Sequence, residues 1–225
     1  MSLDPHGERV PVAVELASPQ RPAPRSAMDR QAHSQVALKT EVIGATHPLR
    51  EQTEAFIRDR YQQRFCARIE HSMPTLVRLC GADGRTCAAL GLRAADFGPL
   101  FVEHYLDLPA ERSTSLALTQ AVARPTLVEV GNLAVDSGAS GRQIIIAMTT
   151  LLATLGYQHV IFAATVQLRA SLNRLGLRAA MLSQADPSRL GNQASHWGSY
   201  YQTQPQVLCG SIRSGIANLR QRGLL

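Results

Sequence analysis

The sequence predicts an α/β (α+β) fold with one central mixed sheet flanked by helices. Strand-like and helical apolar segments alternate along the chain, which is typical of a single sheet covered by helices. Segments 75–80 and 86–93 flank the pair Asp83-Gly84, the signature of a tight turn between antiparallel strands. Segment 126–135 instead runs through a Gly/Ser loop into the helical segment 143–155 and on to another strand. The sheet therefore combines antiparallel and parallel pairing.

Length and composition indicate one main domain. The chain has 225 residues, of which 45% are hydrophobic and 18% charged, as in an ordinary globular protein. Residues 1–35 are rich in proline, serine and alanine and hold no continuous apolar stretch behind a basic start. We expect a disordered leader at 1–35, no secretory signal, and a folded domain at 36–225.

The other elements follow from apolar periodicity and from turn residues. Before the central strand we expect a strand at 35–43, helices at 48–65 and 115–123, and a short helical segment at 100–106. After the helix at 143–155 we expect a strand at 160–165, a helix at 167–175 that Gly176 ends, a strand at 177–182, an irregular segment at 185–201, a strand at 206–212 and a helix at 214–222.

Charge and cysteine usage exclude several classes of partner. The net charge is +6, but the basic residues are scattered arginines with Lys39 as the one lysine, so we expect no nucleic-acid binding. The four cysteines lack the close spacing of a zinc or redox site, so we expect no metal and reduced thiols. No stretch approaches the roughly 18 apolar residues of a membrane span. A cytoplasmic protein is predicted, with peripheral membrane contact left open.

The loop after the central strand has the chemistry of an anion site. Gly138, Ala139, Ser140, Gly141 and Arg142 lead directly into an apolar helix. The first turn of a helix has unpaired backbone N–H groups and a partial positive charge, and glycine lets an anion approach the backbone. A phosphate cradle is one interpretation. A Gly/Ser turn that only caps the helix is the other.

Four motifs occur in an order that resembles the bacterial thermostable hemolysin family. They are Glu129-Val130-Gly131-Asn132-Leu133-Ala134, then Leu168-Arg169 with Arg174-Leu175-Gly176-Leu177, then Ala185-Asp186-Pro187-Ser188-Arg189-Leu190, and Trp197-Gly198-Ser199-Tyr200-Tyr201. The resemblance covers Val42 to the end. The order of elements also resembles the acyltransferase (GNAT-like) fold of GCN5-related N-acetyltransferases and acyl-homoserine-lactone synthases.

The fold resemblance implies an N-acyltransferase. Such an enzyme moves an acyl group, here a fatty acyl group, from a coenzyme A or acyl-carrier-protein thioester to the amine of an amino acid or small amine. No tightly bound cofactor is implied, because the acyl-CoA or acyl-phosphopantetheine is a substrate. Related acetyltransferases have a basic residue near the start of the phosphate loop, where this chain has Asp136. Both donors therefore stay open. The family name implies the alternative, a membrane-active, haemolytic lipid-binding protein without catalysis.

The resemblance also assigns roles along the central strand. Backbone N–H groups near Leu133 and Val135 are placed to bind the thioester oxygen. Glu129, a lone carboxylate in an apolar strand, is the candidate general base, because burial raises the pKa of a carboxyl group. A buried ion pair with Arg169 is an equal alternative. Asn132 is a further catalytic candidate on this strand. It faces the opposite side from Glu129 in a regular strand, unless a bulge intervenes.

Further candidates lie after the central strand. Arg169 can bind a carboxylate or phosphate of either substrate, although a surface salt bridge is the commoner role of such an arginine. Trp197 and Tyr201 can form the floor of an acyl or acceptor pocket, and Tyr200 can return a proton to the leaving thiolate. Packing in the core is the alternative for all three aromatic residues.

Overall fold

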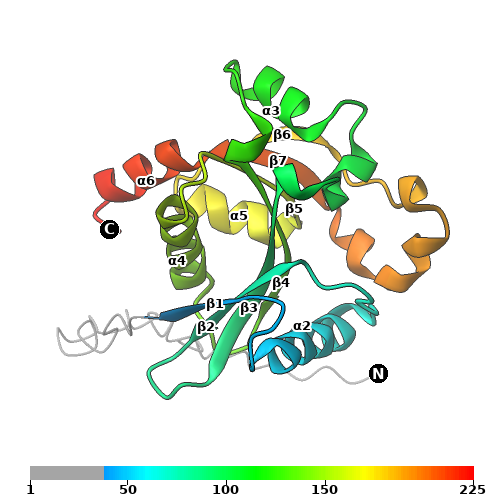
Figure 1. The fold of residues 1–225 in the computed structure, drawn as a ribbon, viewed down its shortest axis with the longest axis vertical. Helices are drawn as coiled ribbons and strands as arrows, with labels where there is room; N and C mark the ends of the chain where they lie inside the picture. Colours follow the sequence, from blue (N-terminus) through cyan, green and yellow to red (C-terminus); the bar gives the residue numbers. More distant parts are fainter. Residues whose placement is uncertain (1–37) are drawn as a thin grey trace, which may run out of the picture. The chain divides into compact units, whose positions relative to one another are not determined.

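The computed structural model of the protein describes residues 38–225, so the expected leader at 1–35 lies outside the described residues. These residues form a seven-stranded sheet in the order β1-β2-β3-β4-β5-β7-β6 (Figure 1). The β4–β5 pair is parallel and every other neighbouring pair is antiparallel, which confirms the mixed sheet. The strands are β1 Lys39–Ile43, β2 Thr75–Cys80, β3 Thr86–Ala94, β4 Leu127–Val135, β5 His159–Ala164, β6 Ala180–Gln184 and β7 Gln206–Ser211.

Helices cover both faces of this sheet. The α-helices are α2 Arg50–Phe65, α3 Ala110–Leu118, α4 Gly141–Thr154, α5 Val166–Arg174 and α6 Ile212–Gln221. The 3-10 helices are η1 Ala95–Phe97, η2 Phe101–Tyr105, η3 Arg124–Thr126, η4 Pro187–Trp197 and η5 Tyr200–Thr203. The expected helix at 167–175 is confirmed, and Gly176 follows it with a φ of +72°, a conformation that glycine adopts without strain.

Alternation along β4 separates two apolar layers. Val128 and Val130 pack with α4 and α6 on one face. Leu127 packs with η2 and α3 on the other face, where Ala134 packs with α2. Figure 1 shows α4 and α6 across the sheet from α2. The two sides of β4 thus have different surroundings, which matters for the site.

Two expected elements are wrong. The helix expected at 115–123 instead spans Ala110–Leu118, starting directly after Pro109 and ending before Thr119, whose φ is +53°. Proline suits this start because the first turn of a helix needs no intrahelical donor. The segment 185–201, expected to be irregular, forms η4 and begins η5. Asp186 starts η4, since its side chain accepts a hydrogen bond from the Ser188 backbone N–H.

A β-bulge interrupts β4. Ala89 of β3 pairs with Ala134 and Gly91 pairs with Gly131, so Asn132 and Leu133 lie opposite the single residue Leu90. Asn132 has a φ of +51°, in the left-handed region. The bulge that the sequence left open is therefore present, and it shifts the alternation so that Leu133 and Val135 pack on the α4 face and Ala134 packs on the α2 face.

Glu103 joins η2 to α3 and η3. Its carboxylate accepts hydrogen bonds from the backbone N–H groups of Leu100 at 2.7 Å and Ala110 at 2.9 Å, and pairs with Arg124 at 2.8 Å. Burial opposes ionisation of this carboxyl group. The hydrogen bonds from Arg124 and the backbone outweigh burial and lower the pKa of Glu103 from 4.5 to about 2.

We expect Glu103 to make folding sensitive to acid. A carboxyl group whose pKa is lower in the folded chain stabilises the fold above its unfolded pKa, and this contribution is lost as the pH falls through the folded pKa. Urea unfolding of the wild type and Glu103→Gln should differ by about 2–3 kcal/mol at pH 7. The difference should shrink between pH 4.5 and 2. A difference that stays constant over this range would contradict the assignment.

Candidate active site

The parallel strands β4 and β5 separate at the bulge. Their pairing runs from Leu127 with His159 to Val130 with Phe162. Within the described residues, Gly131–Val135 have no partner in β5, so their backbone on that side is open. Leu133 and Val135, predicted to contribute N–H groups to a thioester oxygen, lie in this open stretch. The geometry permits donation to an oxyanion, and the role itself stays a prediction.

An apolar cavity of about 240 Å³ lies beside the open stretch, on the face covered by α4 and α6. One water needs only about 10–15 Å³ of such space, so the cavity is far larger than a packing defect. Its lining begins with Val130, Leu133 and Phe162 at the strand separation and reaches Leu177 and Asn218. Met148 of α4 and Leu172 of α5 line its walls. The cavity fits an alkyl chain that starts at the bulge.

Glu129 lies on the opposite face and is 1% exposed. Its two carboxylate oxygens accept hydrogen bonds from the backbone N–H groups of Phe101 at 2.8 Å and Val102 at 2.9 Å. Burial raises the pKa of Glu129 from 4.5, although these two bonds oppose the shift. The alternative of a buried ion pair with Arg169 is not what the structure shows, because backbone amides of η2 hold the carboxylate.

Trp197, Tyr200 and Tyr201 are brought together as the sequence predicted, with one another and with aromatic residues of α2 and η2. The ring centroids of Trp197 and Tyr200 lie 5.2 Å apart, and those of Tyr200 and Tyr201 lie 5.4 Å apart. Phe101, whose N–H binds Glu129, lies 5.5 Å from Trp197. Tyr200 is 8% exposed and burial raises its pKa, so its hydroxyl stays protonated. Its role as a proton donor stays a prediction.

A pair of tyrosine hydroxyls lies on the same face as Glu129. The hydroxyl oxygens of Tyr105 and Tyr201 are 2.6 Å apart. Burial raises the pKa of Tyr201 to about 12 and raises that of Tyr105 as well, and the Glu129 charge adds to the shift of Tyr105. Sequence reasoning missed Tyr105, because the segment 100–106 gives no sign of lying beside a residue 96 positions later.

Met73 covers the bulge on the Glu129 face. A Cβ on Gly91 would lie 2.6 Å from the Met73 Cβ, and a Cβ on Gly131 would overlap the Met73 Cε. The two paired glycines thus leave a slot that the flexible Met73 side chain fills. Met73 was also missed, since only the pairing of β3 with β4 brings the two glycines together.

The loop from Gly138 to Arg142 leads into the N-terminus of α4, as predicted. The Ser140 hydroxyl accepts a hydrogen bond from the Gln143 N–H at 3.4 Å, so the capping interpretation is correct for one donor. Gly138, Ser140, Gly141 and Arg142 are exposed. Arg60 of α2 pairs with Asp136 at 2.9 Å, so the acidic residue at the start of the loop has a counter-ion. Anion binding at this loop stays a prediction.

Arg169 has a structural contact. Its Nη1 donates to the backbone oxygens of Ala164 and Gln204, each at 2.8 Å, and so ties α5 to the segment before β7. Binding of a substrate carboxylate or phosphate by Arg169 stays a prediction.

The family of the chain follows from its sequence. Residues 43–216 match the family described as "Thermostable hemolysin". The chain belongs to the thermostable hemolysin family. The match includes all four motifs on which the resemblance depended, and with them Glu129, the bulge and the aromatic residues Trp197, Tyr200 and Tyr201. No curated protein sequence matches this hemolysin-family chain.

Solved structures similar to this hemolysin-family chain share its fold. TofI, crystallised in a ternary complex with an inhibitor and MTA, has a TM-score of 0.54 at 16% identity, covering 81% of this chain and 96% of TofI. BjaI, a CoA-dependent acyl-homoserine lactone synthase solved with MTA, has a TM-score of 0.55 at 14% identity, covering 82% of this chain and 89% of BjaI. FeeM, an N-acyl amino acid synthase from uncultured soil microbes, has a TM-score of 0.52 at 12% identity, covering 81% of this chain and 99% of FeeM.

These likenesses confirm the expected acyltransferase-like fold. At such low identity they show the fold alone. Among residues 38–225, no helix has the length and apolar character that crossing a membrane requires.

Proposed function

We propose that this protein is an N-acyltransferase that moves an acyl group from a thioester to an amine by direct attack. One observation carries the proposal: the open, bulged stretch of β4 lies between an apolar cavity on one face and the buried carboxylate of Glu129 on the other. A thioester held at the bulge and the carboxylate of Glu129 would thus lie on opposite sides of the same backbone. The similar folds of BjaI and FeeM support this chemistry.

The acyl chain occupies the apolar cavity, and the thioester carbonyl lies at the bulge. Backbone N–H groups near Leu133 stabilise the developing oxyanion. The amine reaches Gly131 when the flexible Met73 side chain, which covers the bulge on this face, moves aside, and it forms the amide bond as the thiolate leaves. Glu129 lies two residues before Gly131 on the same face, about 7 Å along the strand. The proton of the amine therefore reaches Glu129 through a bridging water or the Tyr105–Tyr201 pair.

The donor is an acyl-CoA or an acyl carrier protein, and the acceptor is an amino acid or small amine. The start of α4, where Gly141 and Arg142 are exposed, suits a pyrophosphate or the single phosphate of phosphopantetheine. Both donors are present in the cytoplasm, where we place the reaction. A haemolytic phenotype then comes from a detergent-like N-acyl product.

The test incubates purified protein with acyl-CoA or acyl carrier protein and a panel of amino acids and amines. Thiol release and mass spectrometry should show an N-acyl product and identify donor and acceptor together. Lysis of red cells by the protein alone, with no donor or acceptor and no product formed, would support the membrane-active alternative and overturn the proposal.

The cavity also predicts how acyl length can be changed. Gly215 of α6 lines the cavity, and a Cβ there would lie 3.4 Å from Thr149 and 3.5 Å from Leu177, an ordinary contact. Gly215→Ala should therefore fit, and it should stabilise the helix by about 0.5–1 kcal/mol. Gly215→Leu should extend into the cavity and lower kcat/KM for long acyl donors by about tenfold or more.

Short donors should react with Gly215→Leu at nearly the wild-type rate, and Gly215→Ala is the control for the loss of glycine itself. Equal loss for donors of every length would show that the cavity does not hold the acyl chain.

A further inference from the structure

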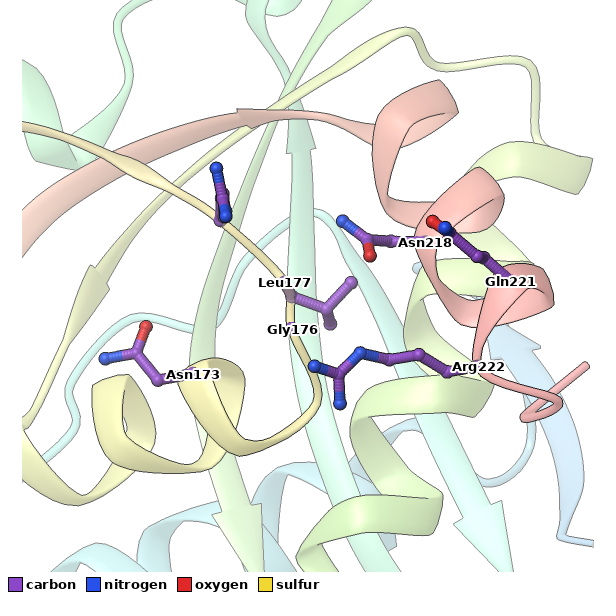
Figure 2. A pocket seen from close by; sticks show the side chains of 7 residues that line it. Asn173, Gly176, Leu177, Asn218, Gln221 and Arg222 are labelled. Atoms are coloured by element: carbon purple, nitrogen blue, oxygen red, sulfur yellow. The ribbon is translucent and has the colours of Figure 1, made fainter.

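A second, polar pocket of about 460 Å³ lies between the end of α5, the start of β6 and the end of α6. Figure 2 shows Asn218 and Arg222 extending from α6 toward the segment that holds Gly176 and Leu177. Asn173 and Arg178 complete the polar lining from the other side. Every charged side chain in this lining is an arginine.

The polar pocket adjoins the apolar cavity. Leu177, Arg178 and Asn218 line both spaces. The opposite end of the apolar cavity is at Leu133 and Phe162, where β4 and β5 separate. An alkyl chain that starts at the bulge and fills the cavity thus has its far end at the polar pocket, beside two guanidinium groups.

No acidic residue of the protein balances this charge nearby in the sequence. Between Asp136 and Asp186, and after Asp186 to the end, the chain contains no aspartate or glutamate. Within the described residues neither Arg178 nor Arg222 forms an ion pair. Guanidinium and carboxamide groups are the donors that bind a carboxylate, and arginine can do so through two parallel hydrogen bonds.

The turn after α5 has room for Arg222. Gly176 has a φ of +72°, and a Cβ on it would lie 2.5 Å from the Arg222 Nε. The Arg222 Nη1 donates to the backbone oxygen of Arg174 at 3.4 Å. Glycine at 176 therefore serves both the backbone conformation and the position of the guanidinium group at the end of the cavity.

We propose that the polar pocket is a subsite for a carboxylate at the far end of the acyl chain, so that the donors include chains with a carboxyl group at both ends. This inference rests on the proposed acyl transfer. The thioester end lies at the bulge, the methylene groups lie in the apolar cavity, and the terminal carboxylate accepts hydrogen bonds from Arg178 and Arg222.

The turnover test compares plain acyl-CoA with ω-carboxyacyl-CoA of the same length, from eight to sixteen carbons. The wild type should prefer the ω-carboxyacyl donor by at least tenfold in kcat/KM at one or two lengths. The double variant Arg178→Gln, Arg222→Gln should lose this preference, measured as the ratio of its kcat/KM values for the two donors of equal length. Arg220→Gln, in the last turn of α6, changes an arginine that is exposed like Arg178 and Arg222 but does not line the pocket, and it should behave as the wild type.

A binding test does not depend on catalysis. Calorimetry with the monomethyl ester of dodecanedioic acid should show at least tenfold tighter binding than with methyl dodecanoate, and the double variant should bind both equally. If this holds and no donor is turned over, the carboxylate subsite stands and acyl transfer is overturned.

Two outcomes overturn the subsite. One is a double variant that reacts with and binds both kinds of chain as the wild type does, while plain donors are still turned over. The other is a wild type that binds free dodecanoate at these arginines and turns over plain donors, but does not turn over ω-carboxyacyl donors. That result would indicate a free fatty acid as the occupant.

Discussion

Glu129→Gln should lower kcat for amide formation by about 100-fold or more, the usual effect of removing a general base. The glutamine side chain has the shape of glutamate but cannot take a proton at neutral pH. One of the N–H groups of Phe101 and Val102 then faces an amide NH2 group in place of a carboxylate oxygen. We expect this to cost about 1–3 kcal/mol of stability. Rates should be measured well below the melting temperature of the variant.

Glu103→Gln is the matched control for Glu129→Gln. Both carboxylates accept two backbone N–H hydrogen bonds around η2, but Glu103 pairs with Arg124 and has no place in the proposed mechanism. Glu103→Gln should therefore lower the stability of the fold and leave kcat unchanged. Equal kcat for Glu129→Gln and wild type would remove Glu129 from the mechanism and leave it as a residue that holds η2.

The pH dependence of Glu129 separates these roles. A general base acts when ionised, and burial raises the pKa of Glu129 above 4.5. The wild-type kcat/KM should therefore fall as the pH is lowered through this raised pKa, and kcat/KM of Glu129→Gln should not show this fall.

The stability of the fold should depend on pH in the opposite direction. Since the folded pKa exceeds the unfolded pKa, the wild type should lose stability relative to Glu129→Gln as the pH rises through the folded pKa.

Local sequence signals predicted most of the sheet but not the details that arrange the site. Asp83-Gly84 and the alternation around it fix the hairpin, and the apolar strand before Gly138 fixes β4. The bulge at Asn132 could only be left open, because it depends on how β3 pairs with β4. Helix α3 starts earlier than the apolar pattern predicts, since the sequence does not show that the helix begins directly after Pro109.

The site was predicted where one segment carried it. Glu129 stands out in sequence as a charge in an apolar strand, and Trp197, Tyr200 and Tyr201 stand out by their concentration. Tyr105 and Met73 do not stand out, because each gains its position from contacts with distant segments. The partner of Glu129 could not be foreseen either, since it is the backbone of η2, which any sequence can supply.

Gly198→Ala should destabilise the fold by about 3 kcal/mol or more beyond the effect of the same change at Gly191. The two glycines have nearly the same backbone conformation, with φ and ψ of +50° and −126° at Gly198 and +55° and −129° at Gly191. Both are strained for alanine. A Cβ at Gly191 meets no atom within 4 Å, whereas a Cβ at Gly198 would overlap the backbone oxygen of Phe65 and lie 2.9 Å from the Cys66 carbonyl carbon.

The overlap cannot be relieved by a side-chain rotation, because the obstacle is backbone. Ser199 N–H donates to the Phe65 oxygen at 2.8 Å, and Arg68 N–H donates to the His196 oxygen at 2.7 Å, so Gly198 lies between two bonds that fasten η4 and η5 to the end of α2. If Gly198 moved away from the Phe65 backbone to make room for a Cβ, these two hydrogen bonds would break and Trp197 and Tyr200 would shift. Thermal and urea unfolding of both variants measures the difference. Equal destabilisation by Gly198→Ala and Gly191→Ala would mean that backbone strain at positive φ explains both effects, and that the backbone at the end of α2 can shift to admit the Cβ at no loss of stability.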